Sequence, residues 1–248
     1  SDPHLIFVVW QSYYTPTEFY GVEYCTVNPS TGLPSAPGHI ADINSPGVVP
    51  TPHVASGRAT DLSNYVLVVW YDYGTIMGAV RSASTGTWYS SLQLHEGEAS
   101  QISLAPITVA LGTHFGNTWT LVWVEGGILS YGDVTISQNP PAVEPVIVAS
   151  GQSIESPSPA QIAHTSPRHP AVAWQEYNPS LQRSVIKYAE RPFGQPWSTL
   201  TVWSSPPSQP AWYYTPSLGG HYASSNVSVT FRQGIVVRYF KRIGGTWS

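Results

Sequence analysis

Five apolar runs of one pattern recur along the 248-residue chain, and this repeat restricts the possible fold more than any other feature. In each run, β-branched and small apolar residues surround an aromatic anchor, and polar residues follow it. The anchors lie 51 to 60 residues apart. They are Trp10, Trp70, Trp123, Trp174 and Phe231. Internal repeats of this length indicate an array of similar supersecondary units.

A second apolar run follows each anchor, and its third residue lies 14, 8, 8, 14 and 8 residues after the anchor. The fourth repeat shows the whole unit. Four runs rich in β-branched and aromatic residues span 158–163, 169–176, 184–191 and 197–203, with Pro, Gly, Asn and Ser between them. Such runs predict short strands joined by turns.

Four short strands in each unit of about 50 residues are typical of a β-propeller. A β-sandwich does not require five copies of one motif, and a parallel β-helix has a shorter period. We therefore predict an all-β fold, a single β-propeller domain with about five four-stranded repeats. The repeats span approximately 1–51, 52–99, 100–154, 155–208 and 209–248.

The first and last repeats are shorter than the others. The sequence begins a few residues before a predicted second strand, and it stops at the start of a predicted fourth strand. The first repeat thus lacks its inner strand and the last lacks most of its outer strand. Two explanations remain open: the chain is a portion of a longer propeller, or an oligomer or a second chain completes the ring.

Charged residues make up only 10% of the chain, against about 25% in an average soluble protein. Ten Lys and Arg against fourteen Asp and Glu do not provide the basic surface of a nucleic-acid-binding protein. The few lysines and many aromatic and hydroxyl residues favour an extracellular or secreted protein.

The sequence predicts neither a cofactor nor a metal site. Cys25 is the only cysteine, which excludes an intrachain disulfide and a cysteine-based zinc site. The eight histidines form none of the spacings typical of metal ligands. No apolar run reaches 18 residues, so no membrane span is expected.

Three turns between predicted third and fourth strands contain a Gly followed closely by a Trp, at 82–88, 194–197 and 244–247. The last two read Gly-x-x-Trp, and the first is one residue shorter. The pattern resembles the Asp-box, Ser-x-Asp-x-Gly-x-x-Trp, of sialidase-type (BNR) propellers, with Ser84 in place of the Asp. The repeats are also similar to those of propeller lectins. The resemblance implies a sugar-related propeller. Sialidases use three arginines, a Tyr–Glu nucleophile pair and an acidic proton donor, and the arginine triad has no assignable counterpart here.

The polar residues that follow the five anchors are expected on the ligand face that the propeller resemblance implies. Paired carboxylates there would allow glycoside hydrolysis by acid–base catalysis. Their equivalence between repeats favours a structural role instead, because catalysis seldom uses the same residue in successive blades. The five residues are Ser12, Asp72, Glu125, Glu176 and Gln233, of which the three acids are the catalytic candidates.

Aromatic residues are expected on the same face, where they would stack on sugar rings or contact a protein surface. Packing between blades is the alternative role. The candidate ligand-binding residues are Tyr13, Tyr14, Tyr73, Tyr177, Trp212, Tyr213 and Tyr214.

The sequence favours a secreted or surface-exposed, non-catalytic, lectin-like propeller whose partner is a glycan or an extracellular protein surface. The first alternative is a sialidase-like glycoside hydrolase. The second is a structural subunit of an extracellular or viral assembly, in which weakly charged β-surfaces contact other subunits.

Overall fold

The computed structural model describes most of the chain as β-strands joined by short turns. No helix in this part of the chain is long and apolar enough to cross a membrane. The described residues are 5–14, 19–43, 50–58, 64–106, 118–135, 143, 145–151, 153–161, 169–192, 194–206, 214–220, 226–233, 235–243 and 246–248.

The strands form five antiparallel sheets, which we call blades 1 to 5 in chain order. Blade 1 contains β1 (Ile6–Tyr14), β2 (Phe19–Val27) and β3 (Gly38–Ile43). Blade 2 contains β4 (His53–Arg58), β5 (Asn64–Asp72), β6 (Thr75–Ser82) and β7 (Leu92–Glu96). Blade 3 contains β8 (Ala99–Pro106), β9 (Thr118–Glu125), β10 (Ile128–Thr135) and β11 (Val146–Ser150). Blade 4 contains β12 (Ile154–Gln161), β13 (Pro170–Asn178), β14 (Arg183–Glu190) and β15 (Ser198–Ser204), and blade 5 contains β16 (Ser217–Gly220), β17 (Val227–Gln233), β18 (Val236–Ile243) and β19 (Thr246–Trp247).

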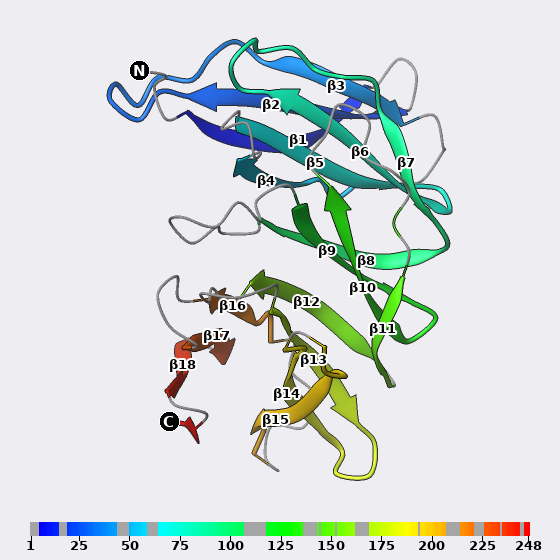
Figure 1. The fold of residues 1–248 in the computed structure, drawn as a ribbon, viewed down its shortest axis with the longest axis vertical. Coiled ribbons are helices and arrows are strands. Elements are labelled where there is room, and N and C mark those ends of the chain that lie inside the picture. Colours follow the sequence, from blue (N-terminus) through cyan, green and yellow to red (C-terminus); the bar gives the residue numbers. More distant parts are fainter. Residues whose placement is uncertain are drawn as a thin grey trace.

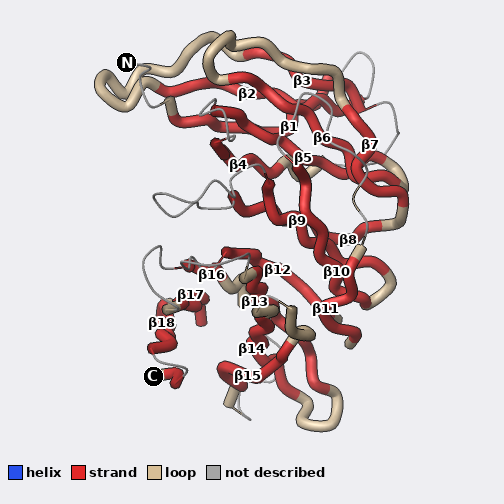
Figure 2. Tube along the Cα trace, in the orientation of Figure 1, coloured by secondary structure: helices blue, strands red, loops and turns tan. Residues whose placement is uncertain are grey.

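Each blade is a meander in which consecutive strands pair with one another. The first strands β4, β8, β12 and β16 of successive blades lie side by side. Figure 1 shows the blades following one another in chain order, from the N-terminus at the top to the C-terminus below, and Figure 2 shows that strands dominate. The predicted all-β propeller architecture is confirmed.

The terminal blades differ from the other three, as the sequence predicts. Among the described residues, blade 1 has three strands and β1 forms one edge of its sheet. In blade 5 the fourth strand, β19, is only two residues long. The inner strand of the first sheet and most of the outer strand of the last sheet are therefore missing from the described chain.

The core consists of the spaces between neighbouring blades. Because side chains alternate between the two faces of a strand, one face of each of blades 2 to 4 contacts the preceding blade and the other face contacts the following blade. Trp70, Trp123 and Trp174 point toward the preceding blade and are at most 1% exposed. Trp10, at the same repeat position, is only half-buried, because no blade in the described part of the chain covers that face of blade 1.

A contact among three residues joins three of the four pairs of neighbouring blades. A tyrosine of the third strand, which in blade 1 is β2, contacts a tryptophan of the next blade edge-on, with 5.1 to 5.4 Å between ring centroids. An arginine of that next blade lies over the same tyrosine ring, 5.3 to 5.9 Å from its centroid. We call this the Tyr–Trp–Arg contact. Its members are Tyr24, Trp88 and Arg81; Tyr131, Trp197 and Arg191; and Tyr188, Trp247 and Arg242.

The last of these contacts includes an ion pair between blades 4 and 5. Arg242 donates a hydrogen bond of 2.5 Å to Glu190, which also accepts a hydrogen bond of 2.8 Å from Tyr188. His169 Nε2 lies 3.2 Å from the same carboxylate. Burial alone would raise the pKa of Glu190, but the contacts with His169, Arg242 and Tyr188 outweigh it and lower the pKa from 4.5 to about 2.

Glu190 should therefore stabilise the fold above pH 4.5 and lose this effect as the pH falls toward 2. We expect Glu190→Gln to be less stable than the parent at pH 7, by about 2 kcal/mol once solvent screening is allowed for. The difference should become small near pH 2, where Glu190 is about half protonated, and vanish as the pH falls further. Urea denaturation of the two proteins from pH 7 to pH 2 measures this difference, and a gap that does not change with pH would contradict the assignment.

Candidate functional site

The turns between second and third strands lie at the same end of the blades as the connections between one blade and the next. Gly97, in the connection from β7 to β8, donates a backbone hydrogen bond of 2.7 Å to Gly74 in the turn between β5 and β6. Gly151 makes the equivalent bond of 3.0 Å to Gly127. We call this end the turn end. It is the surface on which the sequence places the candidate site.

Two candidate tyrosines are widely exposed there. Tyr73 forms the tip of the two-residue turn between β5 and β6 and is 77% exposed. Tyr13 lies near the end of β1, is 50% exposed and contacts Tyr20 of the neighbouring strand, with 5.0 Å between ring centroids. Tyr177, near the end of β13, is half-buried. These rings leave apolar faces and phenolic hydroxyls available to a ligand.

Tyr214 lies elsewhere than the sequence analysis expects. It is 1% exposed and contacts Trp203 and Phe231 edge-on, at centroid distances of 5.0 and 5.8 Å. Its position just before inner strand β16 directs the ring between blades 4 and 5, which is a packing role. Trp212 and Tyr213 lie outside the described residues.

The three candidate carboxylates have different surroundings. Glu125, at the end of β9, lies 3.3 Å from His95 Nε2 of the preceding blade, and its side chain is 40% exposed. Asp72 ends β5, and its Oδ1 atom is buried without a hydrogen-bond partner. Glu176 is 8% exposed in the space between blades 3 and 4. No described contact brings any two of the three together.

Glu176 forms part of a fixed polar pair. Lys187 of the neighbouring strand donates a hydrogen bond of 2.8 Å to it, and Trp174 Nε1 donates another of 3.3 Å. Blade 5 repeats the arrangement, because Arg238 donates a 2.8 Å hydrogen bond to Gln233 at the equivalent positions. This repetition supports the structural role that the sequence favours for these residues.

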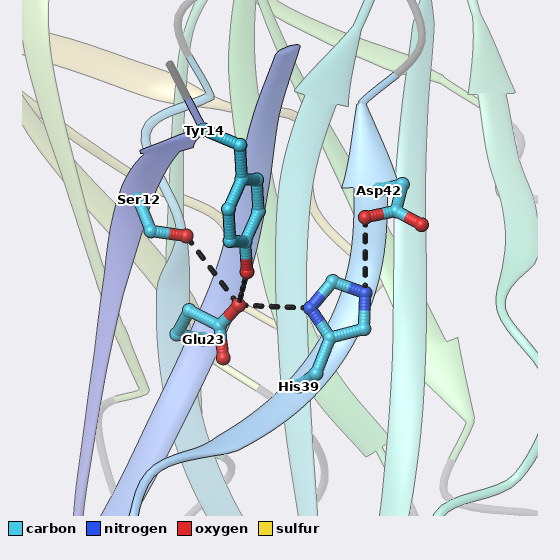
Figure 3. A network of polar contacts seen from close by, with 5 residues as sticks. All are labelled: Ser12, Tyr14, Glu23, His39 and Asp42. Carbon is cyan, nitrogen blue, oxygen red and sulfur yellow. Dashed lines mark hydrogen bonds and ion pairs between the residues drawn. The ribbon is translucent and has the colours of Figure 1, made fainter. Parts of the chain in front are cut away.

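Blade 1 contains a larger polar cluster at the same repeat position, shown in Figure 3. Ser12 and Tyr14 of β1 both donate hydrogen bonds to Glu23 Oε1, the first over 3.4 Å. His39 of β3 bridges two carboxylates, with Nδ1 2.8 Å from Glu23 and Nε2 3.2 Å from Asp42. The hydrogen bond to Glu23 raises the pKa of Tyr14, so its phenol stays protonated at neutral pH.

Sequence reasoning missed this cluster except for Ser12 and Tyr14. The only signal was the register. Trp10 faces Glu23 across β1 and β2, and Glu23 faces His39 across β2 and β3 after an irregularity in the pairing. The cluster lies on the face of blade 1 that no other blade covers, and Glu23 is nevertheless only 8% exposed. In the described part of the chain, no group of three His, Cys, Asp or Glu residues is arranged to hold a metal ion.

No protein-family model and no curated protein matches this chain. Among solved structures, the chain is similar to a GH43 β-1,3-galactosidase, with 8% identity, a TM-score of 0.52, and coverage of 97% of this chain and 56% of that one. It is also similar to an exo-β-1,3-galactanase from Phanerochaete chrysosporium, with 11% identity, a TM-score of 0.48, and coverage of 96% and 59%. A third similar structure is the β-propeller domain of the Trilobed protease from Pyrococcus furiosus, with 8% identity, a TM-score of 0.44, and coverage of 100% and 80%.

This chain thus spans less than two thirds of the length of the two glycoside hydrolases. At 8% identity, the likeness to the β-1,3-galactosidase supports the fold and nothing further.

Removing Lys187 tests whether Glu176 has a structural role. We expect Lys187→Met to lower the free energy of unfolding by about 3 kcal/mol, because it leaves a buried carboxylate without its cation. The double variant with Glu176→Gln should recover most of this loss. Urea denaturation at pH 7 gives the three values, and a single variant within 0.5 kcal/mol of the parent, roughly the scatter of surface substitutions, would contradict a structural pair.

Proposed function

We propose that this protein is a non-catalytic, carbohydrate-binding propeller whose ligand lies on the turn end of blades 1 and 2. Tyr13 and Tyr73 provide exposed ring faces for stacking on sugar rings, and their own phenolic hydroxyls provide hydrogen-bonding groups. The low charge of the chain agrees with a neutral ligand.

The backbone of Tyr73 is the observation that carries the proposal. Its φ is +27° and that of Gly74 is +79°, so both central residues of this two-residue turn have positive φ. Asn-Gly and Gly-Gly suit such turns, whereas a bulky residue there is strained. The equivalent turn of blade 3 uses Gly126 and Gly127, with φ of +55° and +78°. Blade 2 instead retains a strained residue whose ring is 77% exposed, as expected for a binding position.

The substitution Tyr73→Asn separates function from stability. Asn fits the turn, so we expect the free energy of unfolding to rise by about 1 kcal/mol. Loss of the ring should weaken sugar binding roughly tenfold, the size of one aromatic contact. A glycan array would first identify a sugar, and calorimetry with that sugar would then compare the two proteins.

Tyr239→Asn is the matched control, because Tyr239 is 58% exposed on blade 5, away from the proposed site. This variant should bind the sugar as the parent does. Failure of the parent to bind any glycan would overturn the proposal, as would unchanged binding by Tyr73→Asn.

A second candidate function is glycoside hydrolysis, and the hydrogen bond from Tyr14 to Glu23 favours it. Sialidase-type propellers, which the repeats resemble, use a Tyr–Glu pair as nucleophile. Glu23 is placed to accept the phenolic proton as Tyr14 attacks, which would activate a group that is otherwise protonated at neutral pH. Asp72 and Glu125 are the acids at the turn end for proton donation.

Release of sugar from fluorogenic glycosides distinguishes the two functions. If the protein is a hydrolase, Tyr14→Phe and Glu23→Gln should each lower kcat at least 100-fold, the lower end of the effect of losing such a group. Glu125→Gln should alter the pH profile if that residue donates the proton. Under our first proposal, no release occurs with the parent protein, while sugar binding is retained.

A further inference from the structure

The Tyr–Trp–Arg contact follows a rule that can be read at every boundary between described blades. The tyrosine immediately follows the third-strand residue that faces the anchor, at Tyr24, Tyr131 and Tyr188. In all three cases the following blade supplies both the tryptophan and the arginine.

The boundary between blades 2 and 3 shows the converse. The tyrosine position in blade 2 is Gly78, since Met77 faces the anchor Trp70. Blade 3 has neither arginine nor tryptophan between 128 and 150. Leu94 fills the space at Gly78, where an added Cβ would lie 2.7 Å from Leu94 Cδ1. Tyrosine in one blade and the Trp–Arg pair in the next are thus present together or absent together.

Blade 5 has the tyrosine without its partners. Arg238 faces the anchor Phe231, so Tyr239 occupies the tyrosine position. Tyr239 is 58% exposed, whereas Tyr131 and Tyr188 are at most 2% exposed. Val237 and Ile243, which alternate with it on the same face of β18, are 70 and 54% exposed, and Ile235, in the turn before β18, is 98% exposed. The apolar and aromatic residues of this face are of the types found between blades, and Lys241 lies on it at the position that Glu190 has in blade 4. No described blade covers this face.

Blade 1 does not have the groups that would match Tyr239. Its residues at the positions of Arg81 and Trp88 are Val27 and Pro34, which form the same isolated bridge that Arg81 and Trp88 form in blade 2. Blade 1 contains no arginine or tryptophan between 19 and 43. By the rule above, a blade without the Trp–Arg pair is preceded by a blade that has a small residue at the tyrosine position, as blade 2 has Gly78.

We propose that the exposed face of β18 is the docking surface for a further propeller blade that is none of the five in this sequence. That blade carries a Gly-x-x-Trp turn and an arginine at the end of its third strand. Both groups stack on Tyr239, as Trp247 and Arg242 stack on Tyr188. Neither blade 1 nor a second copy of the chain fits, because Trp88, Trp197 and Trp247 are already engaged.

Hydroxyl-radical footprinting of the 248-residue chain gives the first test. We expect Tyr239 to be oxidised at least ten times faster than Tyr188 over the accessible range of protein concentration. Protection of Tyr239 at every concentration would show that blade 1 covers it, and protection that grows with concentration would show that a second copy does. Either result overturns the proposal.

An extended chain gives the second test. Trp197-Ser198 and Trp247-Ser248 are equivalent, so residues 199–248 appended after Ser248 continue the outer strand of blade 5 and add one blade with its own Arg242 and Trp247. The added copy carries Tyr239→Phe, so that its peptides can be distinguished. A control chain also carries Arg242→Val and Trp247→Pro in the added copy, which reproduces Val27 and Pro34 of blade 1.

We expect the added blade to lower the oxidation rate of the original Tyr239 about tenfold and to resist protease. The control blade should leave Tyr239 oxidised as in the parent chain. Equal protection by both blades would overturn the Trp–Arg requirement. An added blade that leaves Tyr239 unprotected, or that protease removes, would overturn the docking surface itself.

Discussion

Face-to-face packing of successive sheets is the interaction on which the rest of this structure depends. Each sheet is a meander of local hairpins. The hydrogen bonds within a sheet do not determine how that sheet packs against the next one. Anchors such as Trp70 and Trp123 bury their rings against the preceding blade, and tyrosines such as Tyr131 and Tyr188 bury theirs against the following one. An aromatic edge contact contributes about 0.5 to 1.5 kcal/mol beyond the buried area, and a cation over the ring adds about the same. Repeating both contacts at three of the four boundaries orients those blades in the same way.

This packing also explains the low charge and the surroundings of the few acids. A strand position that contacts a neighbouring blade must be apolar, or a charge there must be paired. Glu176 and Glu190 satisfy this condition through Lys187 and Arg242, with N–O distances of 2.8 and 2.5 Å. A carboxylate at a repeated strand position is therefore explained by packing first. Catalysis needs an acid that packing does not account for, and Tyr14 with Glu23 is the pair that comes nearest to this.

The fold could be predicted from the sequence because the repeated strand pattern is periodic. The candidate site was predicted less well because its residues do not recur from blade to blade. The anchors, the strand runs and the short terminal blades all follow from repeat spacing. Tyr214 shows the limit of prediction from repeat spacing. The sequence places it in a loop but does not indicate whether its ring faces the solvent or the core, and the structure buries it against Phe231. The contact of Glu23 with His39 depends on strand register and on the pairing irregularity after Val22, neither of which the repeat spacing specifies.

Departures from the repeat are therefore where function is to be sought. A position that keeps the same residue type in several blades is explained by what all blades share. Tyr73 departs from the Gly-Gly turn of blade 3 at a cost in backbone strain, and the fold gains no buried contact from a ring that is 77% exposed. Tyr239 differs in another way. Its residue type is the one that the repeat has at this position, but its ring is exposed where the equivalent rings are buried. The first departure points to a ligand and the second to a missing neighbour, and the two surfaces belong to different blades, so each can be altered without the other.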